Sequence, residues 1–191
     1  LIDRYLVAIE QLHLTAVLVL NKLDLLNDEE LSDLDNILSS YRKIGYPVYK
    51  VSAEDGRGMQ ELKQALAEQT TILVGQSGVG KSSLLNKLNS GKLADVAPLS
   101  ETWGQGTHTT TTSSLYHMPG FDLIDSPGIR EFGLGHINGQ QVFDGFIEFR
   151  PLAGSCKFRD CSHRTEPDCA IQTALDAGQI SVERVESYFR I

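Results

Sequence analysis

The sequence is poor in cysteine, has no long apolar run and carries no excess of basic residues. Its three cysteines all lie within residues 156–169. An odd number of cysteines this close together does not suit a disulfide framework. The longest apolar run, residues 16–20, is far shorter than the ~20 residues that span a bilayer, so we expect no membrane partner. The formal net charge of −8 excludes a chain coated with basic residues for non-specific nucleic-acid binding, but leaves room for a local basic patch.

What is present is the composition of a globular protein. The 191 residues are 41% hydrophobic and 22% charged, enough for one ordinary domain with a small appendage. Because the sequence shows no secretory signal, we expect a cytoplasmic protein, and we expect it to be a monomer. It starts without Met in the middle of a helical pattern, which indicates a fragment of a longer chain.

Short apolar runs alternate with helical patterns in the first half of the chain. Strands are expected at residues 15–20, 46–51, 70–74, 115–118 and 121–124. Helices are expected at residues 4–12, 29–44, 59–66, 81–88, 170–177 and 181–189. Asn27 with Glu30 predicts a capping box for the second of these helices, and Gly45 predicts its end. Strands alternating with helices predict an α/β fold with a mostly parallel, doubly wound sheet.

The sequence GQSGVGKS at residues 75–82 fits the phosphate-binding pattern G-x-x-x-x-G-K-[ST], between an apolar strand and an amphipathic helix. Glycines let backbone N–H groups approach phosphate oxygens, and the helix N-terminus favours negative charge. Lys81 can reach the terminal phosphates and the Ser82 hydroxyl can hold Mg²⁺. The alternative, a chance glycine-rich turn, is disfavoured by the flanking strand and helix. The predicted nucleotide contacts are Gly75, Gln76, Ser77, Gly78, Val79, Gly80, Lys81, Ser82 and Ser83.

The NKLD motif directly follows an apolar strand and predicts recognition of guanine. The Asp24 carboxylate can accept hydrogen bonds from the ring N–H and the exocyclic amine of guanine, neither of which adenine offers. The stem of Lys22 can lie over the base, and Asn21 opens the motif. After the next strand, a turn at Ser52 and Ala53 can present a backbone N–H to the guanine oxygen. Taken alone, NKLD also fits a polar loop before a helix.

A further motif, D-S-P-G, follows the strand predicted to end at residue 124. The Asp125 carboxylate can hold Mg²⁺ through water, and the Gly128 N–H can contact a γ-phosphate. An ordinary turn containing proline is the alternative. Ligands of open α/β sheets bind at the carboxyl ends of strands, so all these motifs can face one nucleotide. This holds although the base-reading motifs precede the phosphate loop, an order that predicts a circularly permuted chain.

The motifs NKLD, VSA, GQSGVGKSS, THTTTT and DLIDSPGIREFGL, in this order and followed by a Cys/His segment, resemble the circularly permuted, ribosome small-subunit-dependent GTPase A family of bacteria. The resemblance covers essentially the whole chain. It implies a Mg²⁺-dependent GTPase that converts GTP to GDP and binds the small ribosomal subunit and its rRNA in late maturation, with nucleotide state controlling binding and release. It also implies an N-terminal OB-fold domain, which is not part of this sequence.

Residues 94–112 are polar and interrupted by proline and glycine, which predicts a mobile switch loop. By resemblance, Thr110 in this loop ligates Mg²⁺ together with Ser82 and Asp125, and Thr109 is the neighbouring alternative.

Many GTPases carry a water-orienting Gln directly after D-x-x-G, but this chain has Ile129 there. The Ile side chain cannot hydrogen-bond water, so either hydrolysis is slow without a partner or another residue acts. We expect His108, beside the switch threonines, to orient the water, as related proteins are thought to do. A surface His without a role is the alternative.

The pattern changes near residue 149, so we predict a GTPase domain over residues 1–148 and a small helical module over residues 149–191. Three cysteines and one histidine cluster there, which suits one structural, tetrahedral Zn²⁺ per chain better than three free thiols. The predicted zinc ligands are Cys156, Cys161, His163 and Cys169. Basic residues surround this segment and fit either a contact with RNA phosphates or a solvated face. They are Arg150, Lys157, Arg159 and Arg164.

Two classes of function remain open. The first is a GTPase enzyme that acts on the small ribosomal subunit, and the second is a zinc-stabilised RNA-binding nucleotide switch in which hydrolysis is incidental. An ATP-dependent P-loop enzyme is disfavoured by NKLD.

Overall fold

The computed structural model describes residues 1–89, 95–98, 114–125, 134–135 and 137–191. Contacts divide the chain into two compact units. Unit 1 comprises Leu1–Ala16, Ser39–Pro47 and Phe132–Ile191, and unit 2 comprises Val17–Leu38 and Val48–Glu131. Unit 1 therefore contains both the first and the last helix of the chain. The domain boundary expected between residues 148 and 149 stays a prediction.

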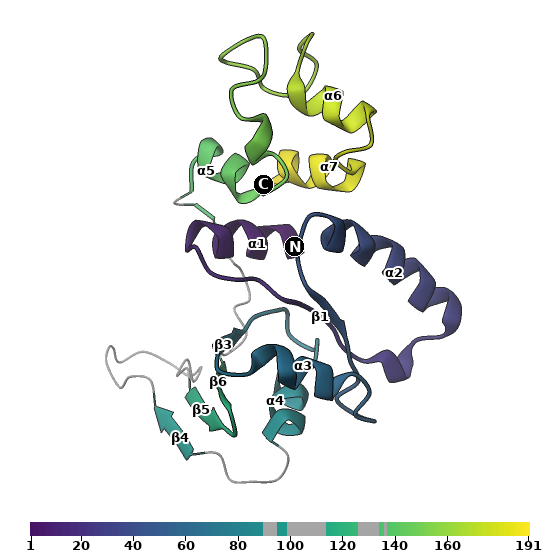
Figure 1. The fold of residues 1–191 in the computed structure, drawn as a ribbon, viewed down its shortest axis with the longest axis vertical. Helices are drawn as coiled ribbons and strands as arrows, with labels where there is room; N and C mark the ends of the chain where they lie inside the picture. The colour runs from purple at the N-terminus through teal and green to yellow at the C-terminus, as the bar shows by residue number, and fades with distance from the viewer. Residues whose placement is uncertain (90–94, 99–113, 126–133, 136) are drawn as a thin grey trace. The chain divides into compact units, whose positions relative to one another are not determined.

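Unit 2 contains all the strands of the described residues (Figure 1). They are β1 (Leu18–Leu20), β2 (Val48–Lys50), β3 (Thr70–Leu73), β4 (Asp95–Pro98), β5 (Ser114–Met118) and β6 (Phe121–Asp125). β1 pairs with β2 in parallel, and the other four form a sheet in the order β3-β6-β5-β4. β3 runs parallel to β6, whereas β5 is antiparallel to both of its neighbours.

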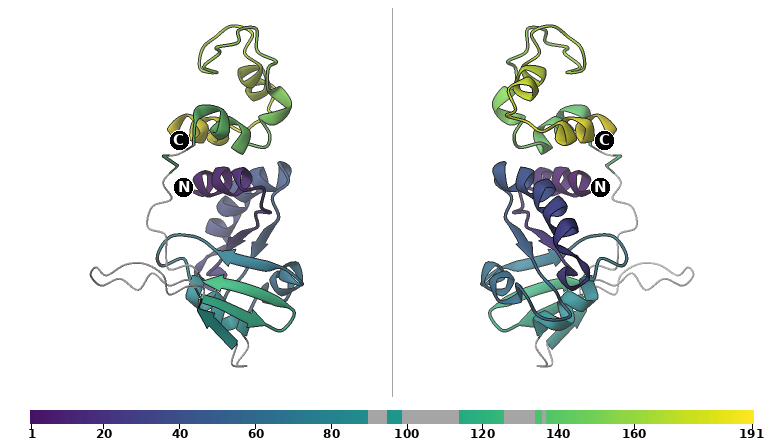
Figure 2. Two further views of the ribbon diagram at one scale, coloured as in Figure 1. Left: turned by 90° about the vertical axis from the view of Figure 1, so that its left-hand side faces the viewer. Right: turned by 90° about the vertical axis from the view of Figure 1, so that its right-hand side faces the viewer.

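The α/β prediction is confirmed, but the described sheets are mixed rather than mostly parallel. The reason is local: only Pro119 and Gly120 separate the paired residues Met118 and Phe121, and so short a turn can join only antiparallel strands. Gly120 has φ = 89°, a conformation that glycine adopts readily. Figure 2 shows the two green strands of this hairpin side by side in both views.

One strand lies where a switch loop was predicted. Asp95–Pro98 forms β4 and pairs with β5, so the prediction of a loop over residues 94–112 is wrong for these four residues. β4 is the outer strand of its sheet, a position that tolerates Pro98 because the outer edge needs no donor. The rest of the predicted loop lies outside the described residues.

Two helices of unit 2, α3 (Met59–Leu66) and α4 (Lys81–Asn89), pack leucine side chains into a core with the four-stranded sheet. The short 3₁₀ helix η1 (Leu23–Leu25) has no buried residue. The buried core contains Leu62 and Leu66 of α3, Leu85 and Leu88 of α4, and Leu123 of β6. The apolar spacing that predicted α3 is thus confirmed as its buried face.

α2 (Asp28–Lys43) begins in unit 2 and ends in unit 1. The predicted capping box is present: Glu30 N donates to Asn27 Oδ1 over 2.9 Å, and Asn27 N donates to Glu30 Oε2 over 3.0 Å. Gly45, with φ = 106°, follows the helix end as expected.

Unit 1 is helical in its described residues, and Figure 1 labels its helices α1, α5, α6 and α7. They are α1 (Ile2–Gln11), α5 (Gly139–Gly145), the 3₁₀ helix η2 (Arg150–Leu152), α6 (Ala170–Asp176) and α7 (Val182–Arg190). α5 was not predicted, although Asn138 and Gln141 form a complete capping box at its start. The core is aromatic: the rings of Phe146 and Phe149 are fully buried and stack with centroids 5.0 Å apart. None of the described helices has the length and apolar content needed to cross a membrane.

A buried ion network joins three separate segments of unit 1. The Arg184 side chain, only 3% exposed, donates to both carboxylate oxygens of Glu148 over 2.6 and 3.0 Å, and it also donates to Asp3. Asp3 accepts a further hydrogen bond from the Tyr41 hydroxyl at 2.9 Å. Burial opposes the charge of Arg184, but the hydrogen bonds and attraction from Glu148 and Asp3 outweigh it and raise the pKa of Arg184 above its usual value.

This network predicts a large stability loss on substitution. Arg184→Ala leaves two buried carboxylates without their partner, so we expect the free energy of unfolding to fall by about 3–5 kcal/mol. The matched control is Arg190→Ala on the same helix, whose pair with Glu186 is solvent-exposed and contributes less than ~0.5 kcal/mol. Urea unfolding followed by circular dichroism measures both; equal midpoints for the two variants would contradict the assigned role of Arg184.

Candidate functional site

Parallel pairing in unit 2 brings the ends of strands to common edges. Leu20 at the end of β1 lies opposite Lys50 at the end of β2, so Asn21 and Val51 leave the sheet together. Leu73 at the end of β3 lies opposite Asp125 at the end of β6. The phosphate loop therefore starts from the same edge as Asp125, as expected for motifs that each follow the carboxyl end of a strand.

The Asn21 side chain connects three motifs that lie far apart in the sequence. Its Nδ2 donates to the Val79 carbonyl of the phosphate loop over 3.1 Å, and its Oδ1 accepts from the Ala53 N–H over 3.1 Å. A Cβ on Gly80 would lie 2.3 Å from Asn21 Nδ2, which explains why glycine is needed there. Asn21 was predicted only as part of the base motif, and this bridging contact was missed because its partners lie 58 and 32 residues away.

Asp24 is oriented by a buried hydroxyl. Ser52 Oγ, in a residue with no exposed surface, donates to Asp24 Oδ1 over 2.6 Å and accepts from the Asp55 N–H over 3.1 Å. The Leu23 N–H donates a hydrogen bond to the Val51 carbonyl over 3.2 Å. This bond joins the backbone of the NKLD loop to that of the VSA loop. Within the described residues no hydrogen bond reaches Asp24 Oδ2, which leaves this oxygen to accept from a ligand.

Lys22 lies beside the phosphate loop. Its backbone has φ = 71°, and its Cε would lie 3.9 Å from a Cβ placed on Gly80. The side chain is exposed, so its aliphatic stem is available to cover a flat ring.

The phosphate loop has the backbone that an anion site requires. Gly75, Gly78 and Gly80 have positive φ values of 153°, 84° and 95°, which side chains with a Cβ rarely adopt. Lys81 Nζ donates to the carbonyls of Gly75 and Gln76 over 2.7 and 2.9 Å. The Lys81 side chain therefore lies across the phosphate loop. Ser82 and Ser83 are exposed in the first turn of α4.

Several predicted site residues lie outside the described residues. They are His108, Thr109, Thr110 and Gly128, together with Ile129 at the position of the absent glutamine.

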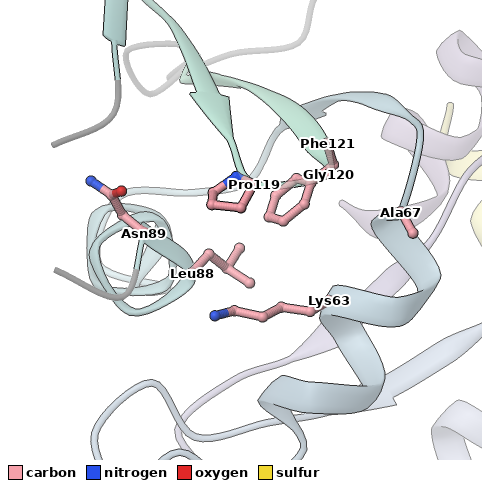
Figure 3. Close-up of a pocket in the computed structure, with 7 residues that line it drawn as sticks. All are labelled: Lys63, Ala67, Leu88, Asn89, Pro119, Gly120 and Phe121. Carbon is pink, nitrogen blue, oxygen red and sulfur yellow. The ribbon is translucent and has the colours of Figure 1, made fainter. Parts of the chain in front are cut away.

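A separate pocket of about 310 Å³ lies at the opposite ends of α4 and β6 (Figure 3). It is lined by Leu88 and Asn89 at the end of α4 and by Phe121 at the start of β6, whereas the phosphate loop precedes α4 and Asp125 ends β6. Lys63 of α3 also extends into this pocket in Figure 3. The pocket is therefore not part of the predicted nucleotide site.

The predicted metal ligands in unit 1 converge. The ligand atoms of Cys156, Cys161, His163 and Cys169 all lie within 4.8 Å of one another. His163 Nδ1 is 3.5 Å from both Cys156 Sγ and Cys169 Sγ, which are 4.0 Å from each other. Atoms bound to one tetrahedral zinc at ~2.1–2.3 Å lie about 3.6–3.8 Å apart, so the cluster fits that ion.

Protonation at this cluster also suits a metal. Loss of hydration lowers the pKa of His163, which favours the neutral imidazole that a metal ion binds. Loss of hydration and the neighbouring thiols of Cys169 and Cys156 raise the pKa of Cys161 to about 11. The Cys161 thiol therefore ionises more readily once a cation lies at the cluster.

Neighbouring groups hold the cluster in place. The Ala170 N–H donates to Cys156 Sγ over 3.4 Å, and Gln172 Nε2 donates to the His163 carbonyl over 2.6 Å. The Phe143 ring of α5 lies 5.4 Å from the His163 ring, centroid to centroid. Gln172 and Phe143 were missed by the sequence analysis; the Asn138–Gln141 spacing was the only local signal of α5.

The basic residues around the cluster have different surroundings. Arg150 pairs with Glu10 over 2.6 Å, Lys157 pairs with Asp168 over 2.7 Å, and Arg164 stacks 4.3 Å from the Phe189 ring. Arg159 is exposed and makes no ion pair with any residue that the structure describes.

The Glu166 carboxylate accepts hydrogen bonds within its own loop from the Ser162 hydroxyl and N–H and from the Arg164 and Thr165 N–H groups. The bonds from Ser162, together with the backbone N–H groups of Glu166 and Thr165, lower the pKa of Glu166 to about 2.

Comparison with known proteins agrees with this geometry. The chain is 58% identical over 189 residues to the "Small ribosomal subunit biogenesis GTPase RsgA" of Pseudomonas putida and 55% identical over 192 residues to the protein of that name from Azotobacter vinelandii. These alignments cover 98% and 100% of this chain, but 55% and 56% of the relatives, so the chain spans about half of their length.

Two solved structures resemble the fold. "YjeQ from Thermotoga maritima" matches 99% of this chain and 63% of its own, with a TM-score of 0.82 and 34% identity. "YloQ, a circularly permuted GTPase" matches 100% of this chain and 60% of its own, with a TM-score of 0.78 and 31% identity. The prediction of a circularly permuted α/β GTPase fold is thereby confirmed.

The family model described as RsgA GTPase matches residues 1–135, well over half of the chain. The match includes the base motif, the phosphate loop and the D-S-P-G segment. This protein therefore belongs to the RsgA GTPase family.

Proposed function

We propose that this chain is the catalytic part of a GTPase that binds the small ribosomal subunit during its late maturation and is released according to its nucleotide state. The observation that carries the proposal is the double hydrogen bond of Asn21, which ties the base-reading loops to the phosphate loop. The names of the relatives supply the ribosomal partner. A cytoplasmic, monomeric protein is consistent with that partner and is part of the proposal.

Guanine binding is assigned to the NKLD and VSA loops. Asp24 Oδ2 accepts from the guanine N–H groups, while Ser52 keeps the carboxylate in place through Oδ1. The Ala53 N–H is engaged by Asn21, so we assign Ala53 to the wall of the base pocket. The stem of Lys22 covers the base.

Phosphate binding is assigned to the loop from Gly75 to Ser83. Lys81 exchanges its bonds to the Gly75 and Gln76 carbonyls for the β- and γ-phosphates, where it offsets charge that develops during transfer. Ser82 and Asp125 would hold Mg²⁺, together with Thr110 or its neighbour Thr109, and the ion would neutralise phosphate charge. The Gly128 N–H contacts the γ-phosphate.

Base selectivity provides the first test. In Asp24→Asn the amide oxygen still accepts from Ser52, but the amide N–H₂ opposes the guanine donors and fits the carbonyl of xanthine. We expect GDP affinity to fall at least ~100-fold and xanthosine diphosphate to bind more tightly than GDP. Asp33→Asn, at an exposed position of α2, is the matched control and should bind GDP like the unchanged chain. Unaltered guanine preference in Asp24→Asn would refute the base assignment.

Turnover provides the second test. We expect GTP but not ATP hydrolysis, faster with purified small subunits, because Ile129 supplies no hydrogen bond to the attacking water. His108→Ala should lower kcat by about 10²–10⁴-fold with little change in GTP affinity, as expected for loss of a water-orienting group. His117→Ala, at an exposed histidine paired with Asp122, is the control. If binding to the small subunit depends on the nucleotide but subunits do not stimulate turnover, the result would instead favour the zinc-stabilised RNA-binding switch.

We propose one Zn²⁺ per chain at Cys156, Cys161, His163 and Cys169. Four protein ligands leave no open coordination position, so the role is structural. When bound, the ion would cross-link the loop of residues 156–169 to the start of α6.

Metal removal tests this assignment. We expect one zinc per chain by elemental analysis, and a chelator should lower the free energy of unfolding by at least ~2.7 kcal/mol relative to protein with free zinc at 100-fold the Kd. Cys161→Ser should lose the metal, whereas Ser155→Ala, beside the first ligand, should retain it. Full stability of the metal-free protein would contradict a structural zinc.

A further inference from the structure

The short loop between the first two metal ligands exposes an aromatic ring. Residues 157–160, between Cys156 and Cys161, are all exposed, and the Phe158 side chain is 42% exposed. The other large hydrophobic side chains that are exposed in the described part of the chain are aliphatic. Phe158 is not part of the aromatic core of unit 1. Packing in that core therefore does not explain why a phenylalanine lies at this position.

The backbone on both sides of Phe158 is held. Cys156 and Cys161 belong to the metal cluster. The Cys161 N–H donates to the Phe158 carbonyl over 3.4 Å, and the Lys157 N–H donates to the Asp168 carbonyl over 3.3 Å. The ring is therefore presented on a constrained loop, which reduces the conformational entropy lost on binding.

Positive charge lies next to the ring. Lys157 Nζ is 5.8 Å from the ring centroid, and its ion pair with Asp168 joins side chains that are 58% and 67% exposed. A pair this exposed contributes little energy, so Lys157 can exchange Asp168 for a phosphate. Arg159, on the other side of Phe158, has no ion-pair partner among the described residues. In a chain of net charge −8, cations on both sides of an exposed ring favour a polyanion with flat bases over an apolar protein surface.

We propose that Phe158 is a stacking platform for one unpaired RNA base, with Lys157 and Arg159 contacting the adjacent phosphates. The proposal rests on the proposed function in taking RNA as the partner, and adds the residue and the kind of RNA structure that it binds. An aromatic face stacks on any base, but only where the base is not already stacked inside a duplex.

The test separates stacking from apolar contact. We compare Phe158→Ala, Phe158→Leu and Phe158→Tyr in the full 191-residue chain, with Val182→Ala, at an exposed aliphatic residue of α7, as the control. Affinity is measured for purified small subunits, for a short single-stranded oligoribonucleotide and for a blunt duplex of the same sequence. 2-Aminopurine in the single strand reports stacking by fluorescence, and zinc content is measured for each variant.

We expect Phe158→Ala and Phe158→Leu to weaken binding to subunits and single strand by about 5- to 100-fold, and Phe158→Tyr to stay within ~3-fold, with unchanged zinc content. Arg159→Ala should weaken binding to all RNAs and lower the salt dependence by about one phosphate contact. Duplex binding should not respond to changes at position 158.

Other outcomes are informative in different ways. Phe158→Leu binding as tightly as the unchanged chain would overturn stacking and indicate an apolar contact with a protein surface of the subunit. Subunit binding that is insensitive to all three substitutions would overturn any contact through Phe158. A single strand bound through Phe158 by a chain that does not bind subunits would support the platform and refute the proposed ribosomal partner. Binding to neither RNA nor subunits would overturn both.

Discussion

The arrangement of the predicted nucleotide-binding loops depends on one asparagine side chain that is hydrogen-bonded at both ends. Asn21 donates to the Val79 carbonyl and accepts from the Ala53 N–H, and so connects loops from three positions in the sequence. The close approach also requires glycine at position 80, where a Cβ would lie within 2.3 Å of the asparagine amide. A circular permutation preserves this arrangement, because a hydrogen bond depends on where strand ends lie in space and not on the order in which the chain visits them.

The packing of unit 1 depends on an ion network and a Cys/His cluster as well as on buried apolar side chains. Its aromatic core around Phe146 and Phe149 is flanked by the Arg184 network and by the Cys/His cluster. The Arg184 network joins segments that are distant in sequence, because Arg184 reaches Asp3 across 181 residues. The Cys/His cluster, in contrast, brings Cys169 to His163 and Cys156 within one short stretch of chain. A buried ion network tolerates few geometries, so it specifies how the segments that it joins pack. A metal ion at the proposed site would place a similar constraint on the Cys/His loop.

Most helices and strands could be predicted because their signals are local. The Asn27–Glu30 box and Gly45 bound α2, and the leucine spacing of α3 is its buried face. The exceptions have physical reasons. α5 is short and was overlooked despite its capping box, and β4 was assigned to a loop because its pairing with β5 is a tertiary contact without a local pattern. In the structure, three of the basic residues near the metal ligands have partners, two of which lie far away in sequence: Arg150 pairs with Glu10 and Arg164 stacks on Phe189. Arg159 makes no ion pair with any described residue.

Local patterns in the chain are enough to identify which chemical groups are available and in what order: the NKLD, VSA and GQSGVGKSS motifs, and three cysteines with a histidine at metal-ligand spacing. Those patterns are carried by neighbouring residues, so they can be recognised without coordinates. The three-dimensional fold is needed to show that Ser52 orients Asp24, that Asn21 bridges to the phosphate loop, and that Phe158 stays outside the aromatic core. These contacts join residues far apart in the chain, and their geometry depends on strand register and helix packing, which no local spacing records.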